Sequence, residues 1–146
     1  MTFAAALLLA TLATQAEPDR LIAITFDDLP MVSATQVPGN VFDALTRHLV
    51  GSIVHHRVPA IGFVNEGKLY DAHGDTDPRR VRLLEQWLAA GLSLGNHTYS
   101  HPDLHQTPLV EFERDLMRGE VITRPLLLGR GKLLHFFRHP FLHTGQ

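Results

Sequence analysis

Four short apolar runs, separated by segments with helical periodicity, constrain the fold of this chain more than any other feature. The runs cover residues 21–26, 59–64, 92–94 and 133–137. The first run is too continuously apolar for a half-exposed strand and is typical of a parallel strand buried on both faces. Strands that alternate with helices imply a parallel sheet joined by right-handed crossovers. The pattern therefore predicts an α/β fold.

The helices between these runs can be located from their first residues. Three segments show helical periodicity, 40–56, 77–91 and 107–118. Each begins with a residue type that caps helix N-termini, and in the last two a proline follows at the first helical position. Pro125 interrupts the segment 119–131, where we expect a break and a short new helix. No internal repeat or linker divides the chain.

The N-terminus has the pattern of an export signal. Residues 3–13 are apolar over about 11 positions, which suits the core of a signal peptide and is too short for a bilayer span of about 20. We expect residues 1–16 to be a signal peptide, residues 21–146 to form the domain, and the protein to be secreted or periplasmic, with no stable membrane span. A buried first helix or a misplaced start codon is the alternative.

Composition excludes several classes of function. The formal net charge is −2 and no basic run is present, which argues against nucleic acid as a partner. The absence of cysteine excludes disulfides, thiolate zinc sites and cysteine nucleophiles. Ten histidines against 13 Lys and Arg residues make a metal site more plausible. The oligomeric state cannot be predicted from these properties.

Polar clusters follow each expected strand. They are Asp27-Asp28, Asn65, the segment 97–101 and Arg138. In parallel α/β folds the carboxyl ends of the strands form one edge, and active sites are built there. We therefore expect these clusters to meet in one site. For Asn65, a position lining the groove and a role in a turn are equally good interpretations.

The residue types in these clusters favour a catalytic metal centre. His97 and His101 stand four apart, in a single turn or a tight loop because Pro102 disfavours a continuing helix. Two imidazoles with the carboxylate of Asp28 leave coordination positions open, and a divalent ion there activates water and polarises a carbonyl. Asp27 can then serve as general base, with Arg138 orienting it.

Three motifs carry a resemblance to a known family. They are Thr25-Phe26-Asp27-Asp28, His97-Thr98-Tyr99-Ser100-His101 and Arg138-His139-Pro140-Phe141, in this order. The chain resembles the polysaccharide deacetylase, or NodB-homology, family of carbohydrate esterases. The resemblance assigns Asp27 as catalytic base, Asp28, His97 and His101 as metal ligands, and Arg138 as support for the base. It also suggests substrate contacts at Pro140 and Phe141, where many members have a tyrosine at the second position.

The resemblance further implies a fold and an activity. The family fold is an incomplete TIM-like barrel, of which this chain resembles the N-terminal portion, truncated after about the fourth strand. The implied function is metal-dependent deacetylation of N-acetylated, or alternatively O-acetylated, carbohydrate such as chitin oligomers or peptidoglycan. Zinc is the first expectation for the ion, with cobalt or another divalent ion as alternatives. The family's general acid belongs to a later motif, which we expect beyond Gln146.

Two other functions fit part of the pattern. A truncated or inactive family member would bind metal or glycan without turnover. Two histidines and one carboxylate also describe the triad of ferrous oxygenases, although the parallel α/β order disfavours it. Outside the motifs, we expect Trp87 in the core, and solvated side chains at four histidines, His48, His55, His56 and His73.

Overall fold

The computed structural model describes residues 22–32 and 39–145, so the expected signal peptide lies outside the described residues. The elements in chain order are β1 (Ile24–Leu29), α1 (Gly39–His55), β2 (Ala60–Val64), the 3-10 helix η1 (Glu66–Leu69), α2 (Pro78–Ala89), β3 (Ser93–Asn96), α3 (Leu109–Arg118), α4 (Thr123–Leu128) and the 3-10 helix η2 (Pro140–Leu142). Strands and helices alternate as the sequence predicted, and the α/β class is confirmed.

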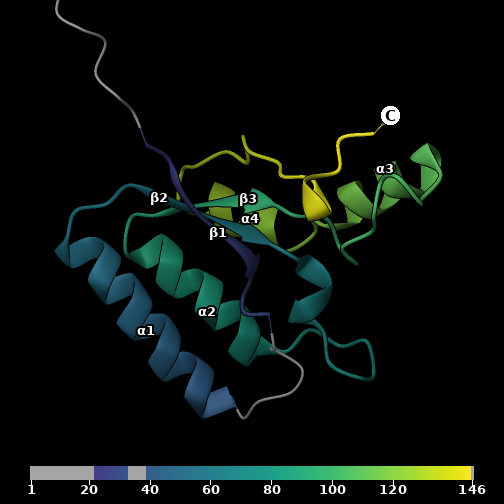
Figure 1. Cartoon of the computed structure of the whole chain (residues 1–146). Helices are drawn as coiled ribbons and strands as arrows, with labels where there is room; N and C mark the ends of the chain where they lie inside the picture. Colours follow the sequence, from purple (N-terminus) through teal and green to yellow (C-terminus); the bar gives the residue numbers. More distant parts are fainter. Residues whose placement is uncertain (1–21, 33–38, 146) are drawn as a thin grey trace, which may run out of the picture.

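The three strands form one parallel sheet in the order β1-β2-β3. Figure 1 shows α1 and α2 lying side by side along the sheet, with α4 close to β3. Each connection between neighbouring strands carries a helix, as parallel pairing requires. This arrangement brings the carboxyl ends of all three strands to the same edge.

The hydrophobic core lies between the sheet and the helices α1, α2 and α4. Its buried members include Ile53 of α1, Trp87 of α2, Leu94 of β3 and Leu127 of α4. Trp87 is 1% exposed, so its expected core position is confirmed, and the four histidines expected in solvent are exposed. Gly62 of β2 permits this packing, because a Cβ there would lie 2.1 Å from Leu29 Cδ1.

Three strand predictions are corrected by the structure. β1 is an outer strand of the described sheet and Ile24 is 38% exposed, so the strand is not buried on both faces as expected. β1 runs from Ile24 to Leu29, so the two aspartates lie inside the strand and do not follow it. Pairing with β2 continues past them, through an irregularity in register between Phe26 and Leu29. The fourth strand, expected at 133–137, is reduced to a single parallel bridge between Asn96 and Phe137. Leu133 and Phe136 are exposed, so this run lacks the burial that its composition suggested.

Helix starts were predicted with mixed success. Asp77 caps α2 as expected, since its side chain accepts a hydrogen bond from the Arg79 N–H. α1 begins at Gly39, which places Asn40 inside its first turn. The N-cap of α3 is Pro108, so Thr107 lies one residue too early to cap it. A break and a short new helix, α4, are confirmed, but the break falls between Arg118 and Thr123, and Pro125 lies in the first turn of α4.

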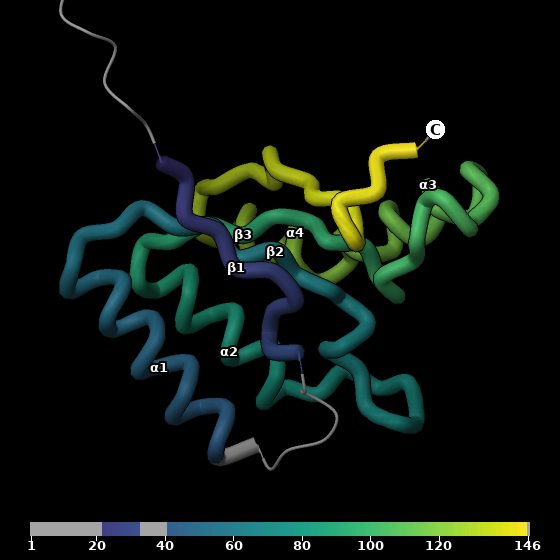
Figure 2. The backbone as a smooth tube through the Cα atoms, in the orientation of Figure 1, coloured from purple at the N-terminus to yellow at the C-terminus, as the bar shows by residue number. Residues whose placement is uncertain are grey.

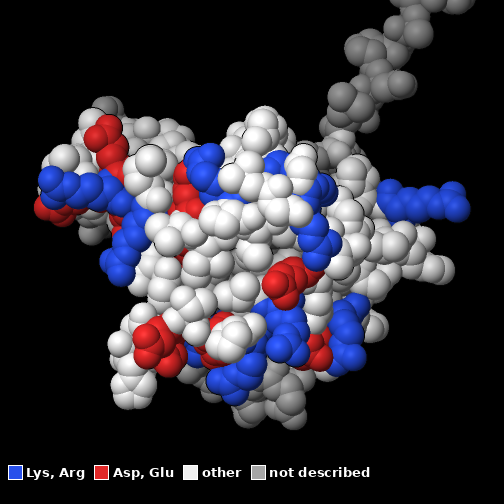
Figure 3. Space-filling view, turned by 180° about the vertical axis from the view of Figure 1, so that it is seen from behind, with Lys and Arg blue, Asp and Glu red and all other residues white. Residues whose placement is uncertain are grey.

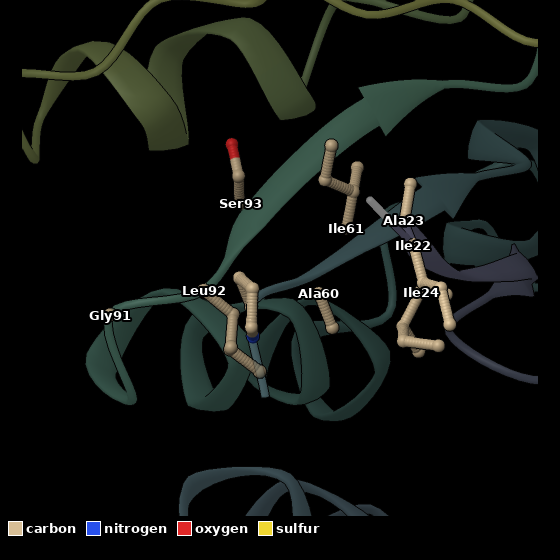
Figure 4. Close-up of a pocket in the computed structure, with 9 residues that line it drawn as sticks. Ile22, Ala23, Ile24, Ala60, Ile61, Gly91, Leu92 and Ser93 are labelled. Atoms are coloured by element: carbon tan, nitrogen blue, oxygen red, sulfur yellow. The ribbon is translucent and has the colours of Figure 1, made fainter. Parts of the chain in front are cut away.

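The two ends of the sheet differ in chemistry. A pocket at the amino ends of the strands is lined mainly by apolar side chains such as Ile22, Ile61 and Leu92 (Figure 4). The polar clusters lie at the opposite end of the sheet, where the strands have their carboxyl ends. The segment after α4 also reaches this end, because Phe137 forms a bridge with Asn96 of β3 (Figure 2). Figure 3 shows the molecule from behind, and on this face acidic and basic side chains are interspersed. No helix in the described part of the chain is long and apolar enough to span a membrane.

Candidate metal centre and active site

A β-bulge in β1 brings both aspartates to one site. Phe26 pairs with Gly62 and Leu29 pairs with Val64, so Asp27 and Asp28 together stand opposite a single residue of β2. In a regular strand, adjacent side chains point to opposite faces. Here the extra residue and the left-handed backbone of Asp28, with φ 64°, place both carboxylates on one pocket. That pocket is also lined by His97, His101, His139, Phe141 and Leu142.

The two histidines come from a tight loop that follows β3. Thr98 and His101 adopt left-handed backbone conformations, with φ 66° and 61°. The loop is therefore not a helical turn, which agrees with the expectation from Pro102. Asp115 of α3 accepts hydrogen bonds from the Tyr99 and Ser100 N–H groups, both at 2.9 Å, and from the Ser100 hydroxyl at 2.7 Å. These contacts fix the loop against α3.

Asn65 supports the same loop from the end of β2. Its side chain is 3% exposed, and in the amide orientation that satisfies both groups it donates to Tyr99 O at 3.1 Å and accepts from the His101 N–H at 3.2 Å. The Gly67 N–H also donates to Tyr99 O, at 2.8 Å. Of the two interpretations of Asn65, the structure supports a role in positioning a turn rather than one lining the groove.

Asp28, His97 and His101 form a group suited to a divalent ion. Each offers one ligand atom, and these atoms all lie within 4.8 Å of one another. His97 Nδ1 lies 2.8 Å from Arg138 O. Because a carbonyl only accepts, Nδ1 carries the proton and Nε2 keeps a free lone pair, as metal-binding histidines require. Zinc fits this donor set.

The environment of His101 also suits a ligand. Its Nε2 lies 3.9 Å from Asp28 Oδ1, and its ring stands edge-on to His97 with centroids 4.8 Å apart. Burial lowers the pKa of His101 below the ordinary value of 6.5, although the charge of Asp28 acts in the opposite direction. The imidazole is therefore neutral at pH 7, the form that binds metal.

Lys68 is a site residue that the sequence did not reveal. It lies in η1, just past the polar end of β2, and its Nζ is 2.7 Å from Asp28 Oδ1. Burial raises the pKa of Asp28, but the hydrogen bond from Lys68 and its positive charge outweigh this and lower the pKa below the ordinary value. The only signal in the sequence was the position of Lys68 near a strand end.

Asp27 lies against Arg138. Arg138 Nη1 is 3.4 Å from both carboxylate oxygens, and the guanidinium lies over the Phe63 ring at 4.6 Å from its centroid. The Arg138 N–H donates to Asn96 O at 3.0 Å, which anchors the third motif beside β3. The structure brings the two side chains together, and their catalytic roles remain predictions.

The two residues suggested as substrate contacts differ in position. Phe141 is 59% exposed and lines the pocket, with its ring 4.7 Å from that of His101. Pro140 is fully buried and does not line the pocket. The structure therefore brings Phe141 into the site and leaves Pro140 out of it. His139 lines the pocket as well, and its Nδ1 is buried without a partner among the described residues.

Comparison with known proteins identifies the family. Residues 14–143 match the model of the polysaccharide deacetylase family, so the chain belongs to that family. A curated relative, the chitooligosaccharide deacetylase of Rhizobium leguminosarum bv. trifolii, is 36% identical over 98 residues. This match covers 67% of the chain and 37% of the relative.

Solved structures show the same fold. A peptidoglycan deacetylase from Bacillus subtilis matches with a TM-score of 0.61 and 22% identity, over 86% of this chain and 51% of that one. A family 4 acetyl xylan esterase from Clostridium thermocellum, in complex with a cobalt ion, matches with a TM-score of 0.61 and 20% identity over the same shares. The chain thus spans about half the length of these structures and less of the curated relative.

Proposed function

We propose that this chain carries the metal-binding and base-carrying part of a hydrolase that removes acetyl groups from N-acetylated carbohydrate. The observation that supports this best is the bulge in β1. It places Asp28 beside His97 and His101 while Asp27, in the same pocket, contacts Arg138. The Asp28 carboxylate is thereby available to bind an ion, and the Asp27 carboxylate is available to accept a proton.

The proposed mechanism assigns a separate task to each side chain. Asp28, His97 and His101 would hold a divalent ion, which supplies polarisation of the acetyl carbonyl and activation of water. Asp27 accepts the proton of the attacking water, and Arg138 keeps its carboxylate oriented. The Arg138 carbonyl fixes the tautomer of His97, so one residue positions both the base and a ligand. Zinc is our proposed ion, with cobalt as the alternative.

The substrate class follows from the relatives. The curated relative is a chitooligosaccharide deacetylase and one structural match is a peptidoglycan deacetylase, which favours N-acetylated glycans. An O-acetylated glycan is the second candidate, because another match is an acetyl xylan esterase. The exposed Phe141 ring at the pocket offers an apolar surface for a sugar.

We also propose the finer architecture and location. The three parallel strands with their helices would form the first units of an incomplete TIM-like barrel, with the site at the carboxyl ends of the strands. The apolar segment 3–13 supports a signal peptide over residues 1–16, and hence a secreted or periplasmic protein.

Metal removal and reloading tests the proposal. Acetate release from N-acetylglucosamine oligomers is measured with the untreated protein, after dialysis against a chelator, and after addition of Zn²⁺ or Co²⁺, with acetylated xylan in parallel. We expect activity to disappear on chelation and to return with either ion. Activity that is unchanged by chelation would contradict the proposal, and release from xylan alone would favour the O-acetyl substrate.

A further inference from the structure

A second cluster of potential ligands lies outside the site described above. It consists of Asp103 and His105, in the loop after His101, and His143, in the segment after η2. Each residue offers one ligand atom, and these atoms all lie within 4.8 Å of one another. Residues 40 positions apart in the sequence thus converge on one point. Neither the family motifs nor the proposed mechanism uses these three side chains.

We propose that Asp103, His105 and His143 form a second divalent-metal site. One carboxylate and two imidazoles suit Zn²⁺, Co²⁺ or Ni²⁺, whereas Ca²⁺ and Mg²⁺ prefer oxygen ligands alone. The inference does not depend on the deacetylase activity, because it rests on a different set of ligands.

The carboxylate of this cluster is already fixed in place. Asp103 Oδ1 accepts a hydrogen bond from the His105 N–H at 2.9 Å, and Oδ2 accepts one from Gln106 Nε2 at 2.9 Å. These contacts orient Asp103 without using either imidazole ring. An ion would therefore meet a carboxylate that loses little conformational freedom on binding.

The imidazole rings of His105 and His143 have nitrogen atoms available to bind an ion. Of their four ring nitrogens, only His143 Nδ1 has a hydrogen-bond partner within the described ranges, namely Asp103 Oδ1 at 2.7 Å. The two rings are stacked, with centroids 4.1 Å apart and planes 5° apart. Parallel rings do not aim their lone pairs at one point, so one ring must turn on binding. His105 is exposed and can rotate without disturbing the core.

A purely structural role is the competing explanation. In that case the Asp103–His143 contact would only tie the loop after β3 to the C-terminal segment, and His105 would merely stack on it. The two explanations differ in one measurable quantity, the number of ions that the chain binds. They also differ in whether His105, which has no structural contact through its ring nitrogens among the described residues, affects that number.

Counting bound ions tests the proposal. Zn²⁺ per chain is measured by equilibrium dialysis with elemental analysis for the full chain, for His105→Ala, for Asp28→Asn, and for His73→Ala as a matched control. His73 is an exposed histidine outside both clusters. We expect two ions for the unmodified chain and the control, and one for each of His105→Ala and Asp28→Asn. Equal counts and affinities for His105→Ala and the unmodified chain would overturn the second site.

A spectroscopic measurement identifies the ligands directly. Imidazole nitrogen shifts are recorded by NMR in the Asp28→Asn variant during a Zn²⁺ titration. We expect the ring nitrogens of His105 and His143 to shift together, in proportion to one bound ion. If neither shifts when the ion binds, or if Asp28→Asn binds no ion at all, the proposal is wrong. Loss of acetate release in Asp28→Asn reports only on the site formed by Asp28, His97 and His101. Failure of the proposed deacetylase function can therefore be distinguished from failure of the second metal site.

Discussion

Lys68 Nζ lies 2.7 Å from Oδ1 of Asp28, the carboxylate that we assign to the metal. The two side chains are 19% and 25% exposed, so the pair is partly shielded from water. An ion that binds Asp28 must share this carboxylate with an ammonium group or displace it. The Lys68 ammonium group therefore competes with a metal ion for the Asp28 carboxylate.

Replacing Lys68 by methionine should tighten metal binding. Lys68→Met keeps most of the side-chain volume and removes the charge. A charge-assisted hydrogen bond contributes about 1.5–3 kcal/mol, so we expect the Kd for Zn²⁺ to fall at least roughly tenfold. Competition with a chromophoric chelator measures it. Lys132→Met, which removes an ammonium that donates to Gly91 O and Leu92 O instead, is the control. An unchanged or larger Kd for Lys68→Met would rule out competition.

Acidification should release the metal only at low pH. Burial lowers the pKa of His101 below 6.5, and the neutral imidazole is the form that binds an ion. We expect the Kd for Zn²⁺ at the Asp28–His97–His101 site, measured in the His105→Ala variant, to be steady down to about pH 6.5 and to rise by about tenfold per unit once His101 is protonated. Zn²⁺ titrations at a series of pH values between about 5 and 8 measure this dependence of the Kd on pH. A rise that begins above about pH 7 would show that His101 is not the limiting ligand.

The loop that carries both histidines should depend on Asp115. Asp115→Ala removes the acceptor of the Ser100 N–H and hydroxyl. The Tyr99 N–H loses the carboxylate but keeps the Asp115 backbone carbonyl, at 3.2 Å. At about 0.5–1.5 kcal/mol net for each of the two Ser100 bonds, we expect the free energy of unfolding to fall by about 1–3 kcal/mol in urea, and metal binding to weaken with it. Ser100→Ala removes only the hydroxyl and should cost less than about 1 kcal/mol. Equal effects for the two variants would mean that the backbone contacts are unimportant.

Glu66 predicts a specific pH dependence of stability. Its buried carboxylate accepts hydrogen bonds from the Ile122 N–H and from the N–H and hydroxyl of Thr123, at the start of α4. Burial raises the pKa of Glu66 despite these bonds. The folded state therefore binds this proton more tightly than the unfolded state. Its contribution to stability is complete below the ordinary value of 4.5 and is lost as pH rises through the folded pKa.

The variant Glu66→Gln isolates this effect, since glutamine does not titrate. We expect the difference in unfolding free energy between the unmodified chain and Glu66→Gln to shrink as pH rises from about 4.5. Urea denaturation at a series of pH values gives this difference. A difference that grows with pH would show that the hydrogen bonds outweigh burial and that Glu66 is held as a carboxylate.

The sequence predicted the elements of the fold better than it predicted where the site residues lie on them. Apolar periodicity located β2, α2 and the edge at which the polar clusters meet. It could not reveal the bulge in β1, because a one-residue change of register leaves no mark in composition. Lys68 was missed for a related reason. Its contact with Asp28 spans 40 positions and depends on η1, a helix that no local sequence pattern predicted.

The fourth strand illustrates a limit of apolar patterns. Residues 133–137 have the composition of a buried strand, yet they pair with β3 at one bridge only. A strand forms where a neighbour supplies a continuous ladder, and composition alone does not contain that information. The three motifs, in contrast, specified the side chains that the structure brings together around Asp28.

Comparing Asp27→Asn with Asp28→Asn tests the central claim, that two adjacent carboxylates have different tasks. Zn²⁺ content and acetate release from N-acetylglucosamine oligomers are measured on the same preparations of both variants. We predict that Asp27→Asn keeps its metal and loses about 10²–10⁴-fold in kcat, the usual contribution of a general base. Asp28→Asn should lose both the ion of this site and the activity. Metal loss in Asp27→Asn, or an active Asp28→Asn variant, would contradict the account.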